Sequence, residues 1–260
     1  MFQVRMTGRG LRLRTVADGP RTRQYPFSRA GYPSSRRSHR IVSALKVLAL
    51  VAPLAACGQY QWHQRVTIEV EAGGTTYTGS SVTQVVVQRR LFKLFGVPLS
   101  SDVYGEAPLV DLGGRGVVVA ALRDMDFGLA MTAFRPRIEE LLSPQTAAGL
   151  EKTNASLQML QSNKWVASVP PRATPMLLYF PRPHDPKSVA EIPRDERALR
   201  GARVKSVTIE LTDDPLTREA LGPIGWVYSL GNRRLDGTTH SVERAPLANR
   251  IYRNDFVREQ

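Results

Sequence analysis

Histidine and carboxylate side chains are the first candidates for catalysis or metal binding. The four histidines lie far apart in the sequence, at His39, His63, His184 and His240. A metal site needs clustered ligands at defined spacing, and His184-Asp185 is the best local pair. Adjacent residues rarely point at one ion, so this pattern favours a structural or solvated role over a metal site. A hydrolase with a site assembled from distant residues is an alternative if the fold brings His184, Asp185 and His240 into one cleft.

Three further patterns allow chemistry but have a simpler structural explanation. Gly79-Ser80-Ser81 lacks the second glycine of the G-x-S-x-G nucleophile turn and predicts a bulge or bend within a strand. Asp213-Asp214 could act as a paired acid and base, but the following Pro215 is typical of a capped helix start. The loop Gly113-Gly114-Arg115-Gly116 lacks the Gly-Lys-Ser/Thr ending of a phosphate-binding loop and predicts a hairpin turn. We therefore expect no catalytic residue, cofactor or metal.

The only cysteine, Cys57, follows a short apolar run. Residues 47–56 carry no charge, which suits a secretory signal core of about 7–15 residues and is short for a membrane span of about 20. The segment Leu54-Ala55-Ala56-Cys57 resembles the lipobox of bacterial lipoproteins. That resemblance implies cleavage between Ala56 and Cys57 and a lipid anchor on the Cys57 thiol. A buried helix with a free thiol and a plain secretory signal are the alternatives.

The composition of the first part of the chain predicts a segment that is removed by processing and does not fold. Residues 1–40 contain ten arginines and one acid, a composition that cannot bury enough apolar surface and predicts a disordered basic leader. Such a leader is long for a lipoprotein signal, which favours a later translation start at Val42. The Arg36-Arg37 pair matches a twin-arginine export signal only weakly. We expect a leader over residues 1–40, a signal peptide over 41–56, a tether over 57–63 and one domain over 64–260.

The charge of the chain is concentrated in that leader. The full sequence has a formal net charge of +13, of which residues 1–40 supply +9, while the chain from Cys57 onward carries +3. A strongly basic domain would indicate nucleic-acid binding, but most of this charge lies outside the predicted domain. We therefore expect no nucleic-acid partner. The predicted partners are a membrane, through Cys57, and another envelope protein.

The pattern after residue 64 predicts an α+β fold that is β-rich, with a mostly antiparallel sheet, hairpins and two or three short helices on one side. Apolar residues alternate over 65–72, and Gly73-Gly74 is typical of a hairpin turn leading into a strand over 75–88. Residues 105–112 and 117–122 predict a second hairpin. Helices are expected over 137–142 and 147–161, and strands over 176–180 and 203–211. The second of these strands changes phase near Ser206.

Two stretches allow contact with lipid. The segment Arg89-Arg90-Leu91-Phe92-Lys93-Leu94-Phe95 could press on an anionic bilayer, although a strand end with one packed turn is favoured. Tyr60 and Trp62 could lie at the headgroup level, although packing of Trp62 on the first strand is slightly favoured.

Several segments are similar to a family of uncharacterised lipoproteins and exported proteins of alphaproteobacteria. The segments are Thr78-Gly79-Ser80-Ser81-Val82, Gly105-Glu106-Ala107, His184-Asp185-Pro186-Lys187-Ser188-Val189 and residues 207–215. This resemblance implies a location and no activity. The expectation is a lipid-anchored cell-envelope protein that faces the periplasm and has a non-catalytic binding or assembly role. By resemblance to enteric lipoprotein sorting, Gly58 after the cysteine favours the outer over the inner membrane.

Overall fold

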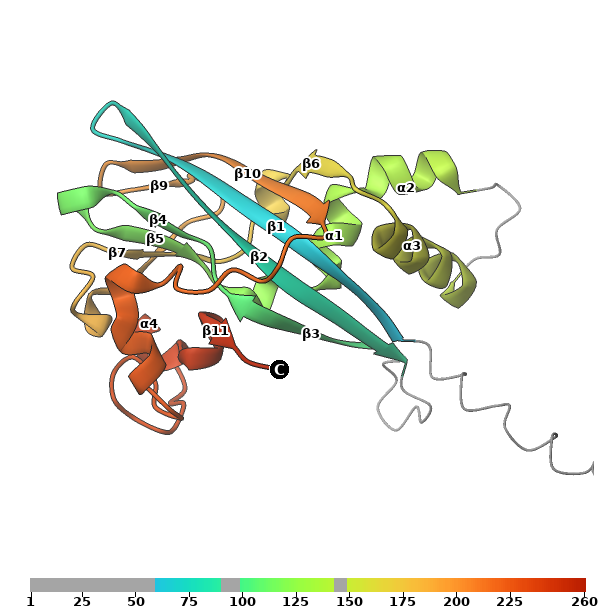
Figure 1. The fold of residues 1–260 in the computed structure, drawn as a ribbon. Helices are drawn as coiled ribbons and strands as arrows, with labels where there is room; N and C mark the ends of the chain where they lie inside the picture. The colour runs from blue at the N-terminus through green and yellow to red at the C-terminus, as the bar shows by residue number, and fades with distance from the viewer. Residues whose placement is uncertain (1–58, 90–98, 143–148) are drawn as a thin grey trace, which may run out of the picture. The chain divides into compact units, whose positions relative to one another are not determined.

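The computed structural model describes residues 59–89, 99–142 and 149–260, all within one compact unit of the chain. Its first two strands, β1 (Gln59–Ala72) and β2 (Thr75–Arg89), form a long antiparallel hairpin (Figure 1). Gly73 and Gly74 make the turn with positive φ angles of 59° and 77°, a backbone conformation that glycine adopts at low cost. The predicted hairpin is confirmed.

The strand β1 begins earlier than the sequence predicted. It starts at Gln59, and Trp62 is buried with 6% of its surface exposed, so residues 59–63 belong to the sheet and not to a tether. Burial of Trp62 is therefore confirmed, although Trp62 is itself a residue of the first strand and does not pack on it from a tether. The predicted bulge at Gly79 is wrong, because β1 and β2 pair without a register shift from Gln59 to Ala72.

The hairpin forms the centre of a seven-stranded antiparallel sheet. The strand order is β11-β3-β2-β1-β10-β6, and β9 pairs with β10 off this path. The remaining strands are β3 (Leu99–Glu106), β6 (Val166–Ser168), β9 (Ala198–Leu199), β10 (Ala202–Thr212) and β11 (Val257–Arg258). The phase change near Ser206 is a real bulge: Glu69 pairs with Ser206 and Val70 with Val204, which leaves Lys205 as the extra residue.

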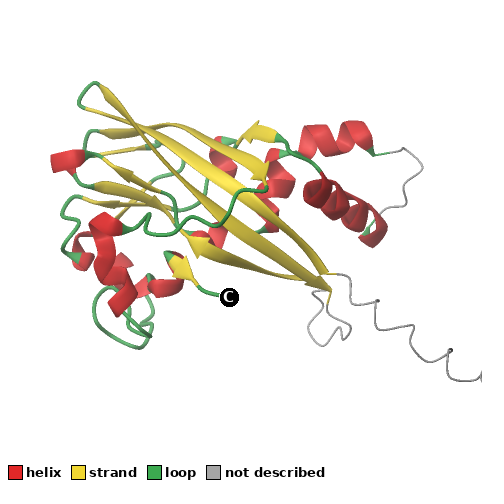
Figure 2. Cartoon of the chain, viewed as in Figure 1, coloured by secondary structure: helices red, strands yellow, loops and turns green. Residues whose placement is uncertain are grey.

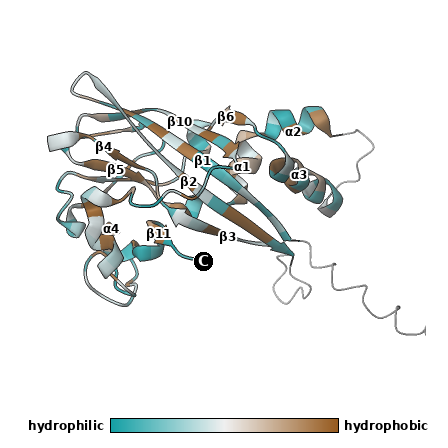
Figure 3. Cartoon of the chain, in the orientation of Figure 1, coloured by the Kyte–Doolittle hydropathy of each residue, from teal (hydrophilic) through white to brown (hydrophobic). Residues whose placement is uncertain are grey.

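A second, four-stranded antiparallel sheet packs against the first. Its order is β4-β5-β7-β8, with β4 (Leu109–Asp111), β5 (Val117–Ala120), β7 (Leu177–Phe180) and β8 (Ala190–Ile192). Its strand β4 contacts β1 and β2, and buried residues of both sheets share one hydrophobic core. The predicted second hairpin is confirmed as β4 and β5, joined through a short 3-10 turn (Gly113–Arg115). Its predicted first strand began too early, because Gly105 and Glu106 belong to β3 of the other sheet. Every residue of β5 and β7 is buried, and Figure 3 shows apolar residues along β5 and along part of β2.

The helices are short and lie around the sheets (Figure 2). They are α1 (Phe127–Ala133), α2 (Arg135–Leu141), α3 (Leu150–Ser162) and α4 (Leu247–Arg250). The 3-10 helices are η2 (Gly113–Arg115), η3 (Leu122–Asp124), η4 (Pro171–Ala173), η5 (Pro186–Ser188), η6 (Gly222–Ser229) and η7 (Arg253–Asp255). The α2 and α3 predictions are confirmed, whereas α1 was not predicted. The α+β, β-rich and antiparallel class is also confirmed.

One predicted helix start is wrong. Residues 213–218 have no regular structure, and the next helix, η6, begins only at Gly222. The side chains of Asp213 and Asp214 pair with distant cations in place of capping a helix. Within residues 59–89, 99–142 and 149–260, no helix combines the length and apolar character that crossing a membrane requires.

Candidate functional site

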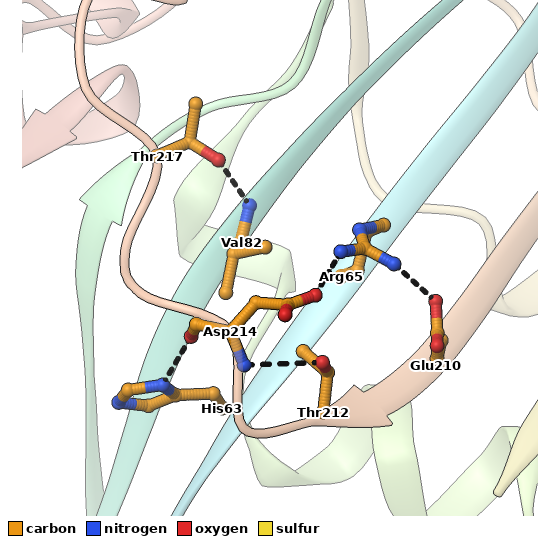
Figure 4. A network of polar contacts seen from close by, with 7 residues as sticks. All are labelled: His63, Arg65, Val82, Glu210, Thr212, Asp214 and Thr217. Carbon is orange, nitrogen blue, oxygen red and sulfur yellow. Dashed lines mark hydrogen bonds and ion pairs between the residues drawn. The ribbon is translucent and has the colours of Figure 1, made fainter.

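Residues 213–219, here called the strap, leave the end of β10 and cross β1 and β2 (Figure 4). The Nδ1 atom of His63 on β1 lies 2.7 Å from the carbonyl oxygen of Asp214. Arg65 on the same strand forms ion pairs with Asp214 and with Glu210 on β10. These contacts hold the first half of the strap over the sheet.

The second half of the strap substitutes for a strand. The amide of Thr217 donates to the carbonyl oxygen of Val82 at 3.1 Å, and the amide of Val82 donates to Oγ1 of Thr217 at 2.9 Å. The ladder between β2 and β3 ends at the pair Gln84 and Tyr104. Beyond it, Gly105 has a φ of +117°, which a residue with a side chain rarely adopts. Thr217 therefore supplies the hydrogen bonds that β3 no longer gives to Val82.

The divergence of β3 from β2 leaves a groove of about 640 Å³. The end of β3 forms one side, with Tyr104 and Glu106, and the strap forms another, with Leu216 and Arg218. Tyr228 of η6 and Val257 of β11 also line the groove. This groove is open, combines aromatic and aliphatic walls with charged groups, and thus has the composition of a ligand site.

Glu106 is the buried polar group of this groove, with 7% of its surface exposed. Its Oε1 accepts a hydrogen bond from the hydroxyl of Tyr228 at 2.7 Å, and its Oε2 accepts one from the amide of Ala220 at 2.7 Å. Its carbonyl oxygen accepts from Oγ of Ser81 at 2.6 Å. Because both carboxylate oxygens are engaged, Glu106 organises the groove and is poorly placed to abstract a proton from a ligand.

The same contact shifts the pKa of Tyr228. Although Tyr228 is 43% exposed, partial desolvation raises the pKa of its phenol above the usual range, and the hydrogen bond to Glu106 raises it further. The phenol therefore stays protonated and donating at neutral pH. A protonated phenol that already donates its hydrogen bond to a carboxylate is poorly placed to transfer its proton to a ligand. The geometry therefore supports ligand recognition more than acid–base catalysis.

The residues considered for a hydrolase do not line this groove. His184 and His240 are both exposed, and Nδ1 of His240 lies 3.2 Å from Oγ1 of Thr239. Asp185 accepts hydrogen bonds from the Arg182 side chain and the Lys187 amide. The Arg182 hydrogen bond is the main cause of a lowered pKa at Asp185. Asp185 thus caps η5, which is a structural role.

The other candidate carboxylates are also engaged structurally. Asp213 forms an ion pair with Lys164, and Asp214 forms one with Arg65. In the part of the chain that the structure describes, no group of three or more His, Cys, Asp or Glu side chains is placed to hold a metal ion. Ala56 and Cys57, the predicted cleavage and lipid-attachment residues, lie outside the described residues.

The sequence did not reveal the groove, because its key contact joins distant residues. Glu106 and Tyr228 are 122 positions apart, and no local motif links them. The only local signal was Gly105, a glycine with a positive φ inside β3 at the point where that strand diverges from β2. Comparison of the chain with protein-family models, curated proteins and solved structures yields no match.

Proposed function

We propose that this chain is a cell-envelope lipoprotein held on a membrane, the outer membrane in preference to the inner, through a lipid on Cys57. In this proposal the folded unit faces the periplasm and binds another envelope component in the groove beside Glu106 and Tyr228, without catalysing a reaction. The proposal includes membership of the alphaproteobacterial lipoprotein family that the sequence resembles.

One observation carries the anchoring part of the proposal. The lipobox-like segment ends at Cys57, and β1 begins two residues later at Gln59. Cleavage before Cys57 would therefore remove none of the described strands or helices. A signal that ends where the fold begins is the arrangement expected of an exported and processed protein.

The same spacing predicts how the domain would stand on the membrane. Two residues reach about 7 Å, so the end of the sheet that holds Gln59, Gln88 and Leu99 would lie close to the lipid surface. Arg89, which is exposed at this end, would face anionic headgroups. The turn at Gly73-Gly74 would stand about 45 Å away along β1.

The strength of the anchor depends on the number of acyl chains. Each buried methylene contributes about 0.8 kcal/mol, so one chain binds reversibly and two or more hold a protein stably. A fully processed Cys57 would keep the domain on the membrane. The groove, which begins at Tyr104 opposite Gln84, would then lie a few residues above the anchored end of the sheet.

Membrane partition and amino-terminal mass test this proposal. We expect the wild type to sediment with membranes and to begin at a modified Cys57, whereas Cys57→Ala stays unprocessed. Val47→Leu is the matched control, because it keeps the apolar run and the cysteine and should mature normally. A wild type that stays in the soluble fraction with residues 1–56 intact would contradict the anchor, and density separation of the two membranes tests the outer-membrane location.

A further inference from the structure

The strand β6 is the last strand on one side of the seven-stranded sheet. It pairs only with β10, through Val166 opposite Glu210 and Ser168 opposite Thr208. Figure 1 shows it at the margin of the sheet, beside α2. Val166 is 68% exposed, the highest value among the large hydrophobic side chains found at the surface of the described residues.

The register shows which backbone groups of β6 are free. The amide of Val169 donates to the carbonyl oxygen of Val207, and the amide of Leu211 donates to the carbonyl oxygen of Trp165, both at 2.8 Å. In an antiparallel ladder, residues two apart point to the same neighbour, so 165, 167 and 169 face β10. The N–H and C=O groups of Val166 and Ser168 therefore point outward, where the described chain offers no strand partner.

A groove of about 400 Å³ lies directly beside this edge. Phe134 and Pro136 form one wall, and Trp165 and Ala167 form the other. The rings of Phe134 and Trp165 are 5.7 Å apart between centroids. An extended chain that added to β6 would place every second side chain on the groove side of the sheet.

The charged residues that line the groove are both cations, Arg137 and Lys164. Their ion pairs, with Glu140 and Asp213, have side chains that are at least half exposed. Exposed pairs of this kind contribute little and exchange easily, so both cations remain available to a ligand.

We propose that the β6 edge and its groove bind an extended peptide segment of a partner protein by strand addition. The segment has apolar side chains at alternate positions and a carboxylate at its ends. Its backbone bonds to the outward groups of Val166 and Ser168, which supplies affinity, and its apolar side chains enter the groove, which supplies specificity. This surface is separate from the groove beside Glu106 and does not depend on the lipid at Cys57.

The test uses the full 260-residue chain and a blocked synthetic peptide, acetyl-Asp-Val-Thr-Val-Thr-Asp-amide. Titration followed by amide NMR shifts should move the signals of Val166 and Ser168 and the indole signal of Trp165. The same peptide with lysine at both ends should bind several-fold more weakly. Absence of shifts at these positions at millimolar peptide, or equal affinity of the two peptides, would overturn the proposal.

Proline substitution tests the outward backbone groups of β6 without removing the hydrogen bonds to β10. Val166→Pro removes one outward N–H and keeps the bonds to β10, so affinity should fall about five- to tenfold, the effect of one net hydrogen bond. Val166→Thr keeps the N–H and is the matched control. Unchanged affinity of Val166→Pro with an unchanged fold would contradict strand addition.

Hydrogen exchange in the free protein gives a readout that needs no peptide. The amides of Val166 and Ser168 should exchange rapidly, whereas those of Ala167 and Val169 should be protected by β10. Protection of Val166 and Ser168 would mean that this chain already covers the edge, and the proposal would fail. A concentration-dependent dimer that Val166→Pro abolishes would assign the edge to a second copy and would equally overturn it.

Discussion

Two margins of the seven-stranded sheet differ in whether their polar groups have hydrogen-bond partners within the chain. At the margin where β3 turns toward β4, here called the sheet corner (Gly79, Glu106, Leu109, Thr217 and Tyr228), the chain supplies a partner for each polar group described above. At the β6 margin, the outward backbone groups of Val166 and Ser168 have no strand partner within the described residues. The comparison teaches that removing the internal polar contacts of the corner should lower stability, whereas changes at the β6 edge should leave stability unchanged and affect binding of an extended peptide.

The physical reason lies in how the two margins are built. The carboxylate contacts of Glu106 and the contacts of Thr217 at the corner join segments that are 114 to 135 positions apart, so each one closes a long loop and depends on the complete fold. The β6 edge is short and follows α3 directly in the chain. A short edge strand limits unwanted pairing but still offers the backbone groups that a specific peptide can use.

The largest expected effect is at Gly79. A Cβ atom there would lie 1.9 Å from the carbonyl oxygen of Leu109 on β4, so the backbone of one strand must move. We expect Gly79→Ala to lower the free energy of unfolding by about 3 kcal/mol or more, measured by equilibrium denaturation. Gly74→Ala is the matched control: its site is open but has a positive φ, so it should cost only about 1 kcal/mol. Equal effects would show that β4 does not approach β2 this closely.

A smaller effect is expected at Glu106. Glu106→Ala removes the acceptor of both the Ala220 amide and the Tyr228 hydroxyl, and we expect a loss of about 2 kcal/mol in the same measurement. Glu259→Ala is the control, because it lines the same groove with a side chain that is 76% exposed and should change stability by about 0.5 kcal/mol or less. If the two variants are equally stable, the Glu106 contacts do not hold the corner together.

The smallest effect concerns the alkaline behaviour of Tyr228. Burial and the bond to Glu106 raise the pKa of its phenol, so the fold favours the neutral form. The resulting stability is present below the ordinary tyrosine pKa of about 10 and is lost as the pH rises through the higher folded pKa. Tyrosinate absorbance should show one late-ionising group that Tyr228→Phe removes.

The control for this titration is the Glu106→Ala background, in which the late-ionising group should shift toward lower pH. A wild-type titration identical to that of Tyr228→Phe would contradict the contact. Together with the peptide titration at Val166, these measurements test whether the polar contacts of the corner stabilise the fold and whether the β6 edge binds an extended peptide.

Predictions from the sequence were wrong at positions where a contact with a distant residue determines the local structure. Asp213-Asp214-Pro215 has the local pattern of a helix start, but the contact of Asp214 with His63 and the hydrogen bonds of Thr217 with Val82 hold the strap extended. Gly79 has the local pattern of a bulge, but the passage of β4 at Leu109 explains the glycine in an unbroken ladder. In both cases a tertiary contact outweighs a weak local preference.

The sequence by itself determined the elements whose pattern is local. The alternation of Val66, Ile68 and Val70, the Gly73-Gly74 turn and the phase change at Ser206 each lie within a few residues and were read correctly. Only the tertiary structure decided where β3 leaves β2, how Glu106 meets Tyr228 and which edge of the sheet stays open. Those features depend on contacts between residues that are 20 to 122 positions apart, and no local spacing along the chain encodes them.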